Sequence, residues 1–267
     1  MELGLRDKVV LVTGASKGLG SAIALAFGEE KSQLVLVART QSELDQVAMD
    51  AREKGAAQVL AIAADLTQAD EIERVVSTAI QQFGTIHVLV NNAGILGSFS
   101  SFEDLTDEEW LQVFNLNLFS VVKLTRAILP YMTRQKWGRV INLSSESGLQ
   151  PDAVMPHYSA TKAALLNLTK SLSKAYGQHG VLVNSVSPAF IKTPMVEAML
   201  AQIAHDKEFS VEEAETYFLK ENRPHIELRR GGTSPEVAAA VVFLASEAAS
   251  FIVGTNLRVD GGSVASI

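Results

Sequence analysis

The sequence predicts an α/β fold in which helices cover both faces of a parallel β-sheet. Short apolar segments with the length of buried strands alternate along the chain with longer segments that have the period of amphipathic helices. The strand-like segments are apolar throughout rather than at every second residue, as in strands that are buried on both faces. Such strands, separated by helices, form a doubly wound sheet with right-handed crossovers.

The expected elements follow one another without a linker, repeat or low-complexity tract, so we expect a single domain over residues 1–267. The expected strands are 8–13, 33–38, 57–63, 86–90, 138–143, 181–187 and 256–259. The expected helices are 19–30, 42–54, 68–83, 107–132, 157–177 and 235–247. Residues 188–234 interrupt this alternation and contain a charged helical stretch near 210–222. Because ligands bind at the carboxyl ends of such strands, we expect 188–234 to be a substrate lid, the alternative being a surface insertion.

Composition narrows the partners and the compartment. A chain of 267 residues with 47% hydrophobic content can bury a substantial core. A formal net charge of −7 argues against nucleic acid or an anionic membrane as the main partner. There are no cysteines, no apolar run near the roughly 20 residues that span a bilayer, and no room for a signal peptide before the first strand. We therefore expect a cytoplasmic protein.

A glycine-rich turn follows the first expected strand. The segment Thr13–Gly20 connects the apolar run Val9–Val12 to a helical stretch, which is the context of a dinucleotide site. Gly14 permits a tight turn, Gly18 lets a pyrophosphate approach the backbone, and Gly20 lets the helix pack on the strand. The other turn residues expected at the cofactor are Ser16, Lys17 and Leu19. Steric need for glycine in a loop is the alternative explanation.

A second motif provides acid–base chemistry. Tyr158 and Lys162 are four residues apart and share one face of a helix, and Ser145 precedes the tyrosine by thirteen residues. An ammonium beside a phenol favours the phenolate, so we expect a lowered tyrosine pKa. A hydroxyl at a neighbouring strand end can hold a substrate oxygen. A surface Tyr/Lys pair is the alternative for this spacing alone.

Four motifs together resemble the short-chain dehydrogenase/reductase family over nearly the whole chain. They are Thr13-Gly14-x-x-x-Gly18-x-Gly20, Asn91-Asn92-Ala93-Gly94, the serine, tyrosine and lysine at family spacing, and Val259-Asp260-Gly261-Gly262. The resemblance implies a Rossmann sheet and hydride transfer between a nicotinamide cofactor and a carbonyl or alcohol.

The resemblance also implies residue roles. Tyr158 is the general acid, Ser145 binds the carbonyl oxygen, and Lys162 lowers the tyrosine pKa and holds the nicotinamide ribose. A fourth member is an asparagine, for which the family register selects Asn117 over Asn115. Ser144 and His157 are neighbouring candidates that we set aside, because adjacent residues on a strand or helix point in different directions. His157 is expected at the rim of the site at most.

Charge after the second strand favours NADP(H) over NAD(H). Where NAD-preferring relatives have an acid, this chain has Ala38 followed by Arg39, and an arginine can bind a 2′-phosphate. Lys17 adds a second cation, although both could simply be solvated. The remaining residues that the resemblance places at the cofactor are Asp65, Asn91, Ala93, Gly94, Pro188, Ile191 and Thr193. Ala189 stands where the family often has glycine.

The sequence says less about the identity of the substrate than about the type of reaction. The expected pocket wall is apolar and comprises Ile95, Leu96, Leu149, Val154, Met155, Phe190 and Met195. The leading hypothesis is an NADPH-dependent carbonyl reductase, with a 3-oxoacyl thioester as one candidate substrate. The alternatives are an NAD-linked alcohol, polyol or sugar dehydrogenase and, in a different class, a non-catalytic dinucleotide-sensing protein.

Two further expectations concern partners and metals. Family members commonly form tetramers or dimers through helices equivalent to 107–132 and 157–177, so we expect a homo-oligomer. The basic residues Arg134, Lys136 and Arg139 are expected to form a solvated helix end, the alternative being contact with an acidic carrier protein. Without thiolates or a paired-histidine motif, no catalytic metal is expected.

Overall fold

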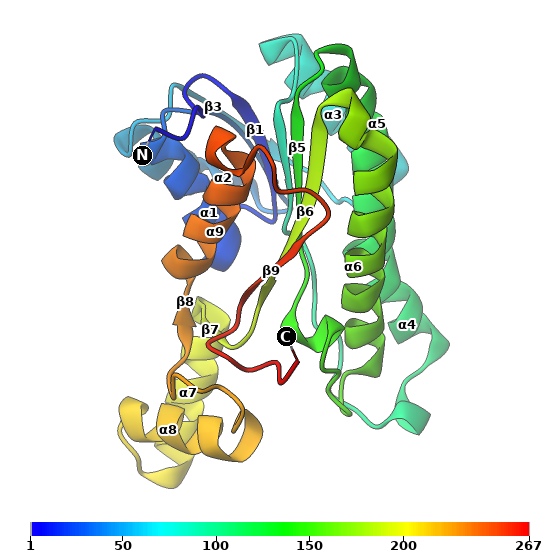
Figure 1. The fold of residues 1–267 in the computed structure, drawn as a ribbon. Helices are drawn as coiled ribbons and strands as arrows, with labels where there is room; N and C mark the ends of the chain where they lie inside the picture. Colours follow the sequence, from blue (N-terminus) through cyan, green and yellow to red (C-terminus); the bar gives the residue numbers. More distant parts are fainter. Residues whose placement is uncertain (1, 267) are drawn as a thin grey trace.

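The computed structural model describes residues 2–266, which are built around one parallel sheet (Figure 1). In this part of the chain the sheet has seven strands in the order β3-β2-β1-β4-β5-β6-β9. Their bounds are β1 (Val9–Thr13), β2 (Gln33–Ala38), β3 (Gln58–Ala63), β4 (Val88–Asn91), β5 (Gly138–Leu143), β6 (Val181–Pro188) and β9 (Asn256–Val259). Each strand lies within about two residues of its expected range. The doubly wound α/β fold is therefore confirmed.

Helices cover both faces of this sheet, with α1, α2 and α9 on one side and α3, α5 and α6 on the other (Figure 1). The bounds are α1 (Gly18–Glu29), α2 (Gln41–Glu53), α3 (Ala69–Phe83), α4 (Asp107–Phe114), α5 (Ser120–Arg134), α6 (Pro156–Tyr176), α7 (Pro194–Lys207), α8 (Val211–Asn222) and α9 (Ser234–Ala245). Among residues 2–266, no helix combines the length and apolar character required to cross a bilayer.

The strands divide their side chains between two apolar layers. In β1, Val10 and Val12 join the layer under α1 and α9, whereas Val9 and Leu11 join the layer under α3 and α5. This division follows from the two-residue side-chain period of a strand. Burying each such side chain contributes about 1.5–3 kcal/mol, which explains why β1 is apolar at these four successive positions.

The strand order reverses at β1, which pairs with β2 on one side and β4 on the other. From β2 the chain continues to β3 on one side of the sheet, and from β4 it continues to β5 on the other side. The loops after β1 and β4 therefore diverge at the carboxyl edge of the sheet. Ligands of open α/β sheets bind in this position. The glycine-rich turn follows β1 and the Asn91-Asn92-Ala93-Gly94 motif begins at the end of β4, so both motifs lie at this reversal.

The expected helix 107–132 is interrupted, and this expectation was wrong in detail. Between α4 and α5 the backbone forms a π-helical turn over Asn115–Phe119. Such turns are rare and often accompany functional sites. Asn117 lies in this turn, and its side-chain amide bonds to the backbone of Ile95. The local departure from α-helical geometry therefore coincides with an asparagine that bonds a neighbouring loop.

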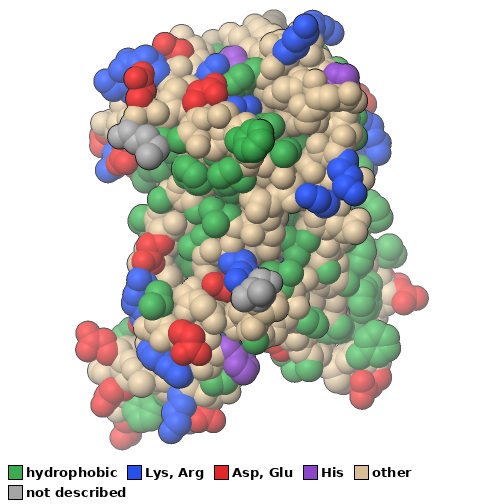
Figure 2. Space-filling view, viewed as in Figure 1, with side chains coloured by type: hydrophobic (Ala, Val, Ile, Leu, Met, Phe, Trp, Pro, Cys, Tyr) green, Lys and Arg blue, Asp and Glu red, His purple; other side chains and the backbone are tan. Residues whose placement is uncertain are grey.

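Residues 188–234 form an appendage beyond the carboxyl ends of the strands (Figure 1). The expected helix near 210–222 is α8, which begins with a capping box between Ser210 and Glu213. The sequence did not predict α7 or the pairing of β7 (Ile191–Lys192) with β8 (Gly232–Thr233). The appendage has its own small core, whose buried members are Phe190, Leu200, Leu219 and Ile226. Figure 2 shows acidic and basic side chains gathered over its outer face.

Candidate active site

Hydrogen bonds hold the ends of β1 and β4 together. The Thr13 hydroxyl accepts from the backbone N–H groups of Asn92, at 2.9 Å, and Ala93, at 3.0 Å. The Asn92 side chain in turn donates to the Thr13 carbonyl at 2.9 Å. These bonds fix the loop after β4 against the start of the glycine-rich turn.

Three glycines give the glycine-rich turn its backbone conformation and its close packing against α1. Gly14 and Gly18 have φ values of 64° and 57°, in the left-handed region that favours glycine. A Cβ on Gly20 would lie 2.1 Å from the Gly14 carbonyl oxygen, so the close approach of α1 to the turn requires glycine there. Lys17, at the start of α1, caps no backbone N–H with its side chain. The first N–H groups of α1 are therefore available to a phosphate, and the turn fits a dinucleotide.

The loop after β6 faces this turn. A Cβ on Gly18 would lie 3.6 Å from the Thr193 side chain. Ile191, which is buried, and Thr193 follow Pro188 at the end of β6. The residues expected at the phosphates and those expected at the nicotinamide thus lie on loops that adjoin one another.

Charged side chains after β2 and β3 lie near the glycine-rich turn, and Arg39 is one of them. Arg39 is exposed directly after β2, and its charge contributes to the lowered pKa of Asp65, whose carboxylate is held mainly by hydrogen bonds from Thr67. The other expected cation, Lys17, lies 3.8 Å from the Glu43 carboxylate on α2. Glu43 therefore offsets part of the charge of Lys17. Of the two expected cations, Arg39 is the better candidate to bind an anionic ligand group.

The side chains of the second motif converge at the carboxyl end of β5. The Lys162 ammonium donates to the Leu143 carbonyl at 2.7 Å and lies 5.5 Å from the centre of the Tyr158 ring. Ser145 is buried, and its hydroxyl accepts from the backbone N–H of Ser147. Ser144 instead donates to the Lys162 carbonyl at 2.8 Å. The two serines therefore have different partners, as expected for adjacent residues after a strand.

Burial governs the ionisation of both groups. It raises the pKa of the Tyr158 phenol above its ordinary value, and the neighbouring Glu146 carboxylate raises it further, whereas interaction with Ser145 lowers it. Burial also lowers the pKa of Lys162 to about 8. The expected lowering of the tyrosine pKa was wrong for the polypeptide alone, because the effect of burial outweighs that of the hydrogen bond with Ser145. The phenol is consequently held in its protonated form.

Asn117 is fully buried and points towards the loop after β4. Its carbonyl oxygen accepts from the Ile95 N–H at 2.9 Å, and its amide nitrogen donates to the Ile95 carbonyl at 2.8 Å. A Cβ on Gly94 would lie 3.2 Å from the Asn117 carbonyl oxygen and 3.7 Å from the Lys162 ammonium. Asn117 and Lys162 thus both lie close to Gly94, whereas Asn115 is exposed.

Asn91 lies within the sheet rather than beside the glycine-rich turn. Its buried amide nitrogen donates to Asn142 at 2.9 Å and to Thr125 at 3.2 Å. Asn142 continues this polar network to Thr169 on α6. The side chain of Asn91 therefore joins β4 to β5 and α5, and a cofactor contact at this position would involve its backbone.

The expected pocket residues do not lie in one enclosed cavity. Leu149, Val154 and Met195 are exposed, and Met155 is buried. Ile95 and Leu96 are half-buried in the loop after β4. Phe190 stacks on Phe218, with ring centres 4.9 Å apart. The expected wall therefore divides into exposed residues, before α6 and at the start of α7, and less exposed residues, in the loop after β4 and at Met155 and Phe190.

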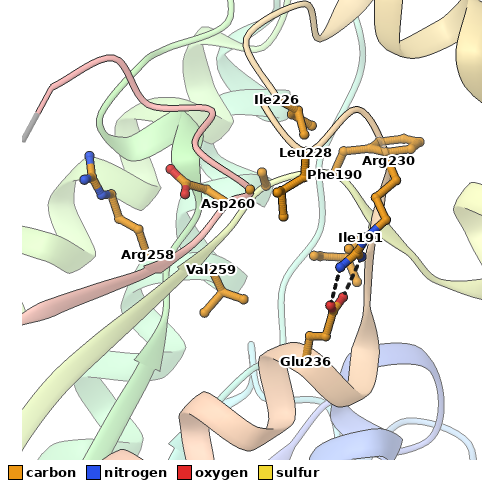
Figure 3. A pocket seen from close by; sticks show the side chains of 12 residues that line it. Phe190, Ile191, Ile226, Leu228, Arg230, Glu236, Arg258, Val259 and Asp260 are labelled. Carbon is orange, nitrogen blue, oxygen red and sulfur yellow. Dashed lines mark hydrogen bonds and ion pairs between the residues drawn. The ribbon is translucent and has the colours of Figure 1, made fainter.

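A cavity of about 190 Å³ lies between the appendage and β9 (Figure 3). Its labelled lining residues include Phe190, Ile226 and Leu228 on one side and Val259 and Asp260 on the other. Of the expected pocket residues, Phe190 lines this cavity. No group of three or more His, Cys, Asp or Glu side chains arranged to hold a metal occurs within residues 2–266.

Two expectations about exposure were wrong. His157 is fully buried rather than at a rim, with its ring 6.0 Å from that of Trp110, because the start of α6 packs against α4. Arg139 is buried at the start of β5, over the Trp137 ring and 3.6 Å from Glu247, and does not belong to a solvated helix end. Both residues are buried because the helix or strand that carries them packs in the interior.

Glu146, which follows Ser145 directly, was not among the residues predicted from the sequence. It is 7% exposed and contacts Arg223 and Ser263, which come from distant parts of the chain. An acid three residues after the expected buried strand 138–143 was the available signal, because a buried carboxylate requires partners. Nothing in the sequence indicated which partners these would be.

Comparison with known proteins identifies what the chain is similar to. A family model described as short chain dehydrogenase matches residues 8–204. An uncharacterized oxidoreductase of Bacillus subtilis, YvaG, is 38% identical, and the match covers 100% of both chains. The 3-oxoacyl-[acyl-carrier-protein] reductase FabG of Thermotoga maritima is 34% identical over 97% of this chain and 99% of its own. The L-sorbose reductase of Gluconobacter frateurii, solved with NADPH and L-sorbose, has a TM-score of 0.94 at 32% identity and 100% coverage of both chains.

Proposed function

This chain belongs to the short-chain dehydrogenase family and is an NAD(P)-dependent oxidoreductase that reduces carbonyl groups; we propose that its substrate is a ketone and its reductant NADPH. The observation that carries this proposal is the convergence of Ser145, Tyr158, Lys162 and Asn117 at the carboxyl edge of the sheet, beside the glycine-rich turn. All four residue types that the family uses for its chemistry are present, which argues against a non-catalytic dinucleotide-sensing protein.

In the proposed reaction Tyr158 is the proton donor. The carbonyl oxygen gains negative charge as its carbon is reduced, and the protonated phenol transfers its proton to that oxygen. The raised pKa of Tyr158 keeps this proton in place before the reaction. Ser145 hydrogen-bonds the same oxygen and orients it. When bound, the reduced nicotinamide supplies the hydride.

Lys162 and Asn117 have supporting roles in this proposal. With a pKa of about 8, Lys162 is mostly an ammonium at neutral pH, and its charge stabilises the phenolate that remains after proton transfer. Its bond to the Leu143 carbonyl fixes the position of that charge. We propose that Asn117, held by the Ile95 backbone, positions a water through which the proton on Tyr158 is replaced.

The proposed cofactor residues divide according to the part of the cofactor that each would hold. The glycine-rich turn and the start of α1 would bind the phosphates, and Arg39 would bind a 2′-phosphate through charge-assisted bonds. Asp65 would contact the adenine, and Lys162 would hold the nicotinamide ribose. The others, at the pyrophosphate and the nicotinamide, are Gly14, Ser16, Lys17, Gly18, Leu19, Gly20, Asn91, Ala93, Gly94, Pro188, Ile191 and Thr193.

Two substrate classes compete within this proposal. The similarity to a 3-oxoacyl-[acyl-carrier-protein] reductase supports a 3-oxoacyl thioester, and the similarity to an L-sorbose reductase over the whole chain supports a keto sugar. The exposed apolar residues Leu149, Val154 and Met195 favour a substrate with an acyl chain, which we take as the first candidate. A keto sugar is the second.

We also propose that the chain is one domain in which residues 188–234 form a lid, hereafter the lid, and that it assembles as a dimer or tetramer. The lid has its own apolar core and lies beyond the strand ends, as a mobile cover would. Leu111 on α4 and Phe119 in the π-helical turn are exposed apolar side chains close to the helices through which family members associate. Light scattering coupled to size exclusion measures the assembly directly.

The test of the proposed function is NADPH oxidation by purified protein with a panel of 3-oxoacyl thioesters, simple ketones and keto sugars. We expect ketone-dependent oxidation that falls by about 10²–10⁴-fold in Tyr158→Phe, the range for loss of a general acid. NADPH binding, followed by fluorescence, should be unchanged in the variant. Undiminished turnover in Tyr158→Phe would refute the assigned chemistry, and oxidation with keto sugars alone would select the second substrate class.

A further inference from the structure

Glu146 is a buried carboxylate whose contacts bring three distant chain segments together. It follows Ser145 and begins the short 3₁₀ turn Glu146–Gly148. The Ser263 hydroxyl, in the C-terminal segment after β9, donates to one of its carboxylate oxygens. The Arg223 guanidinium, at the end of α8 in the lid, lies 3.5 Å from the other oxygen. A carboxylate with these contacts connects the Ser145 segment to both the lid and the chain end.

Arg223 also reaches the segment that precedes Tyr158. Its guanidinium lies 3.0 Å from the carboxylate of Asp152, which is in the turn before α6. One oxygen of Asp152 accepts from the Val154 N–H, so this turn is fixed locally as well. Arg223 therefore bridges the segment carrying Ser145 and the segment carrying Tyr158 from the lid side.

The C-terminal segment is shaped to present Ser263. The Asp260 carboxylate accepts from the backbone N–H groups of Gly262 and Val264, each at 3.1 Å, which forms a tight turn around Ser263. The Gly261 carbonyl accepts from the Leu228 N–H of the lid at 3.2 Å. In Figure 3, Leu228 points towards the loop that carries Asp260. A backbone hydrogen bond from Leu228 thus joins the lid directly to this segment.

We propose that Glu146 is a positioning residue that fastens the lid, through Arg223, and the C-terminal segment, through Ser263, to the Ser145 segment, and so sets how the substrate is enclosed over Ser145 and Tyr158. The inference rests on the proposed function, because it assigns substrate enclosure to the lid. It extends that function by naming the contacts that close the site.

Charge gives the proposal a second consequence. The titratable and charged groups that face Glu146 are Arg223, Asp152, Asp260 and Tyr158. Burial raises the pKa of Glu146, and Arg223 and Ser263 oppose this rise. When ionised, Glu146 raises the pKa of Tyr158. A neutral residue at this position should therefore shift the ionisation of Tyr158 towards lower pH.

The test compares Glu146→Gln, Arg223→Gln and Arg223→Lys with the wild-type enzyme. We expect the ketone KM to rise by about tenfold or more in Arg223→Gln, with kcat changed by less than about threefold, because enclosure weakens while the reacting groups remain. Arg223→Lys keeps a cation and should recover much of the loss. In Glu146→Gln we expect a similar rise in KM and a shift of the pH midpoint of alcohol oxidation to lower pH. Arg229→Gln, whose ion pair with Glu227 stays within the lid, is the matched control and should leave KM within twofold.

The combined variant tests whether the two residues act as one unit. The KM increase in Glu146→Gln/Arg223→Gln should be less than the product of the two single increases. A multiplicative increase would overturn the pairing, and an unchanged KM in Arg223→Gln would overturn the proposal. A pH midpoint in Glu146→Gln that stays at the wild-type value would overturn the charge effect.

Hydrogen exchange separates this proposal from the proposed function, because it requires no turnover. Amides of Val211–Asn222 should exchange faster in Arg223→Gln and Glu146→Gln than in the wild type, and Arg229→Gln should match the wild type. Faster exchange in a protein that reduces no ketone would refute the proposed function and support the fastening contacts. Ketone reduction without any change in exchange or KM would refute the fastening contacts and leave the function intact.

Discussion

Replacement of Lys162 by methionine should make the protein more stable at neutral pH while removing its activity. The lysine is 5% exposed, and burial lowers its pKa to about 8 from an ordinary value of 10.5. The difference of about 2.5 between these values corresponds to about 3 kcal/mol of unfavourable free energy for the buried ammonium. Methionine has a similar length and carries no charge, so Lys162→Met removes this cost.

One lost contact offsets part of the gain. The Leu143 carbonyl accepts from Lys162 at 2.7 Å and would lose this partner, at a cost of about 1–3 kcal/mol for a buried acceptor. The expected net effect at pH 7 is a gain of about 1 kcal/mol in the free energy of unfolding. Because the folded-state pKa lies below the unfolded one, the unfolded chain binds more protons between pH 8 and 10.5, and wild-type stability rises over that interval. The variant lacks this rise, so its advantage should shrink above pH 8 and then reverse.

Urea denaturation at fixed protein concentration, at pH 7 and in steps from pH 8 to 10.5, measures the difference between the two proteins. Lys170→Met, exposed on the same helix, is the matched control and should stay within about 0.5 kcal/mol of the wild type at pH 7. A Lys162→Met protein that is clearly less stable at pH 7, or a difference that stays constant from pH 8 to 10.5, would refute the reasoning.

Three other changes have expected outcomes. Arg39→Asp should weaken NADP binding by about 10–100-fold and leave NAD binding equal or tighter, measured by fluorescence titration; an unchanged ratio would contradict the role of Arg39. Gly20→Ala should abolish cofactor binding and lower the melting temperature, because its Cβ would lie 2.1 Å from the Gly14 carbonyl oxygen; normal NADPH affinity would show that the turn can relax. His87 has a pKa lowered to about 4 by burial and Lys8, so wild-type stability, complete above pH 6.5, should fall as the pH drops towards 4, by about 1 kcal/mol because solvent screens this half-buried ring. His87→Asn should remove that part of the pH dependence in acid denaturation, and an identical profile would contradict it.

The sheet could be predicted because its strands are buried on both faces. A strand such as β1, in which every residue from Val9 to Thr13 is buried and the first four are apolar, leaves a nearly continuous apolar segment in the sequence. The glycine-rich turn and the Tyr158/Lys162 spacing are also local, so they could be located from short segments. Predictions were reliable where the determining contacts lie within a few residues of one another or in one continuous element.

Features set by distant contacts were not predictable in this way. Glu146 and Ser263 are 117 residues apart, and no local pattern links them. Asn117, in the π-helical turn, bonds to Ile95, 22 residues earlier, and no local pattern indicates this partner. Likewise α7 packs against α8 and the strand end rather than against the sheet, so its apolar residues do not follow one clear stripe. The prediction of a lowered pKa for Tyr158 was wrong for a related reason, because the extent to which the phenol is buried depends on the whole fold.

The candidate site is held mainly by backbone groups, and this has a functional consequence. Lys162 is fixed by the Leu143 carbonyl, Asn117 by the Ile95 N–H and carbonyl, and Asn92 by the Thr13 carbonyl. Backbone partners of this kind are positioned by the sheet and its loops, independently of any bound molecule. The acid–base side of the site is therefore organised before substrate arrives, and little ordering free energy is required there on binding. Ordering is required instead at the lid, whose attachment to Ser145 depends on side-chain contacts at Arg223 and Glu146. Substitutions at these side chains should accordingly change substrate binding more than proton transfer.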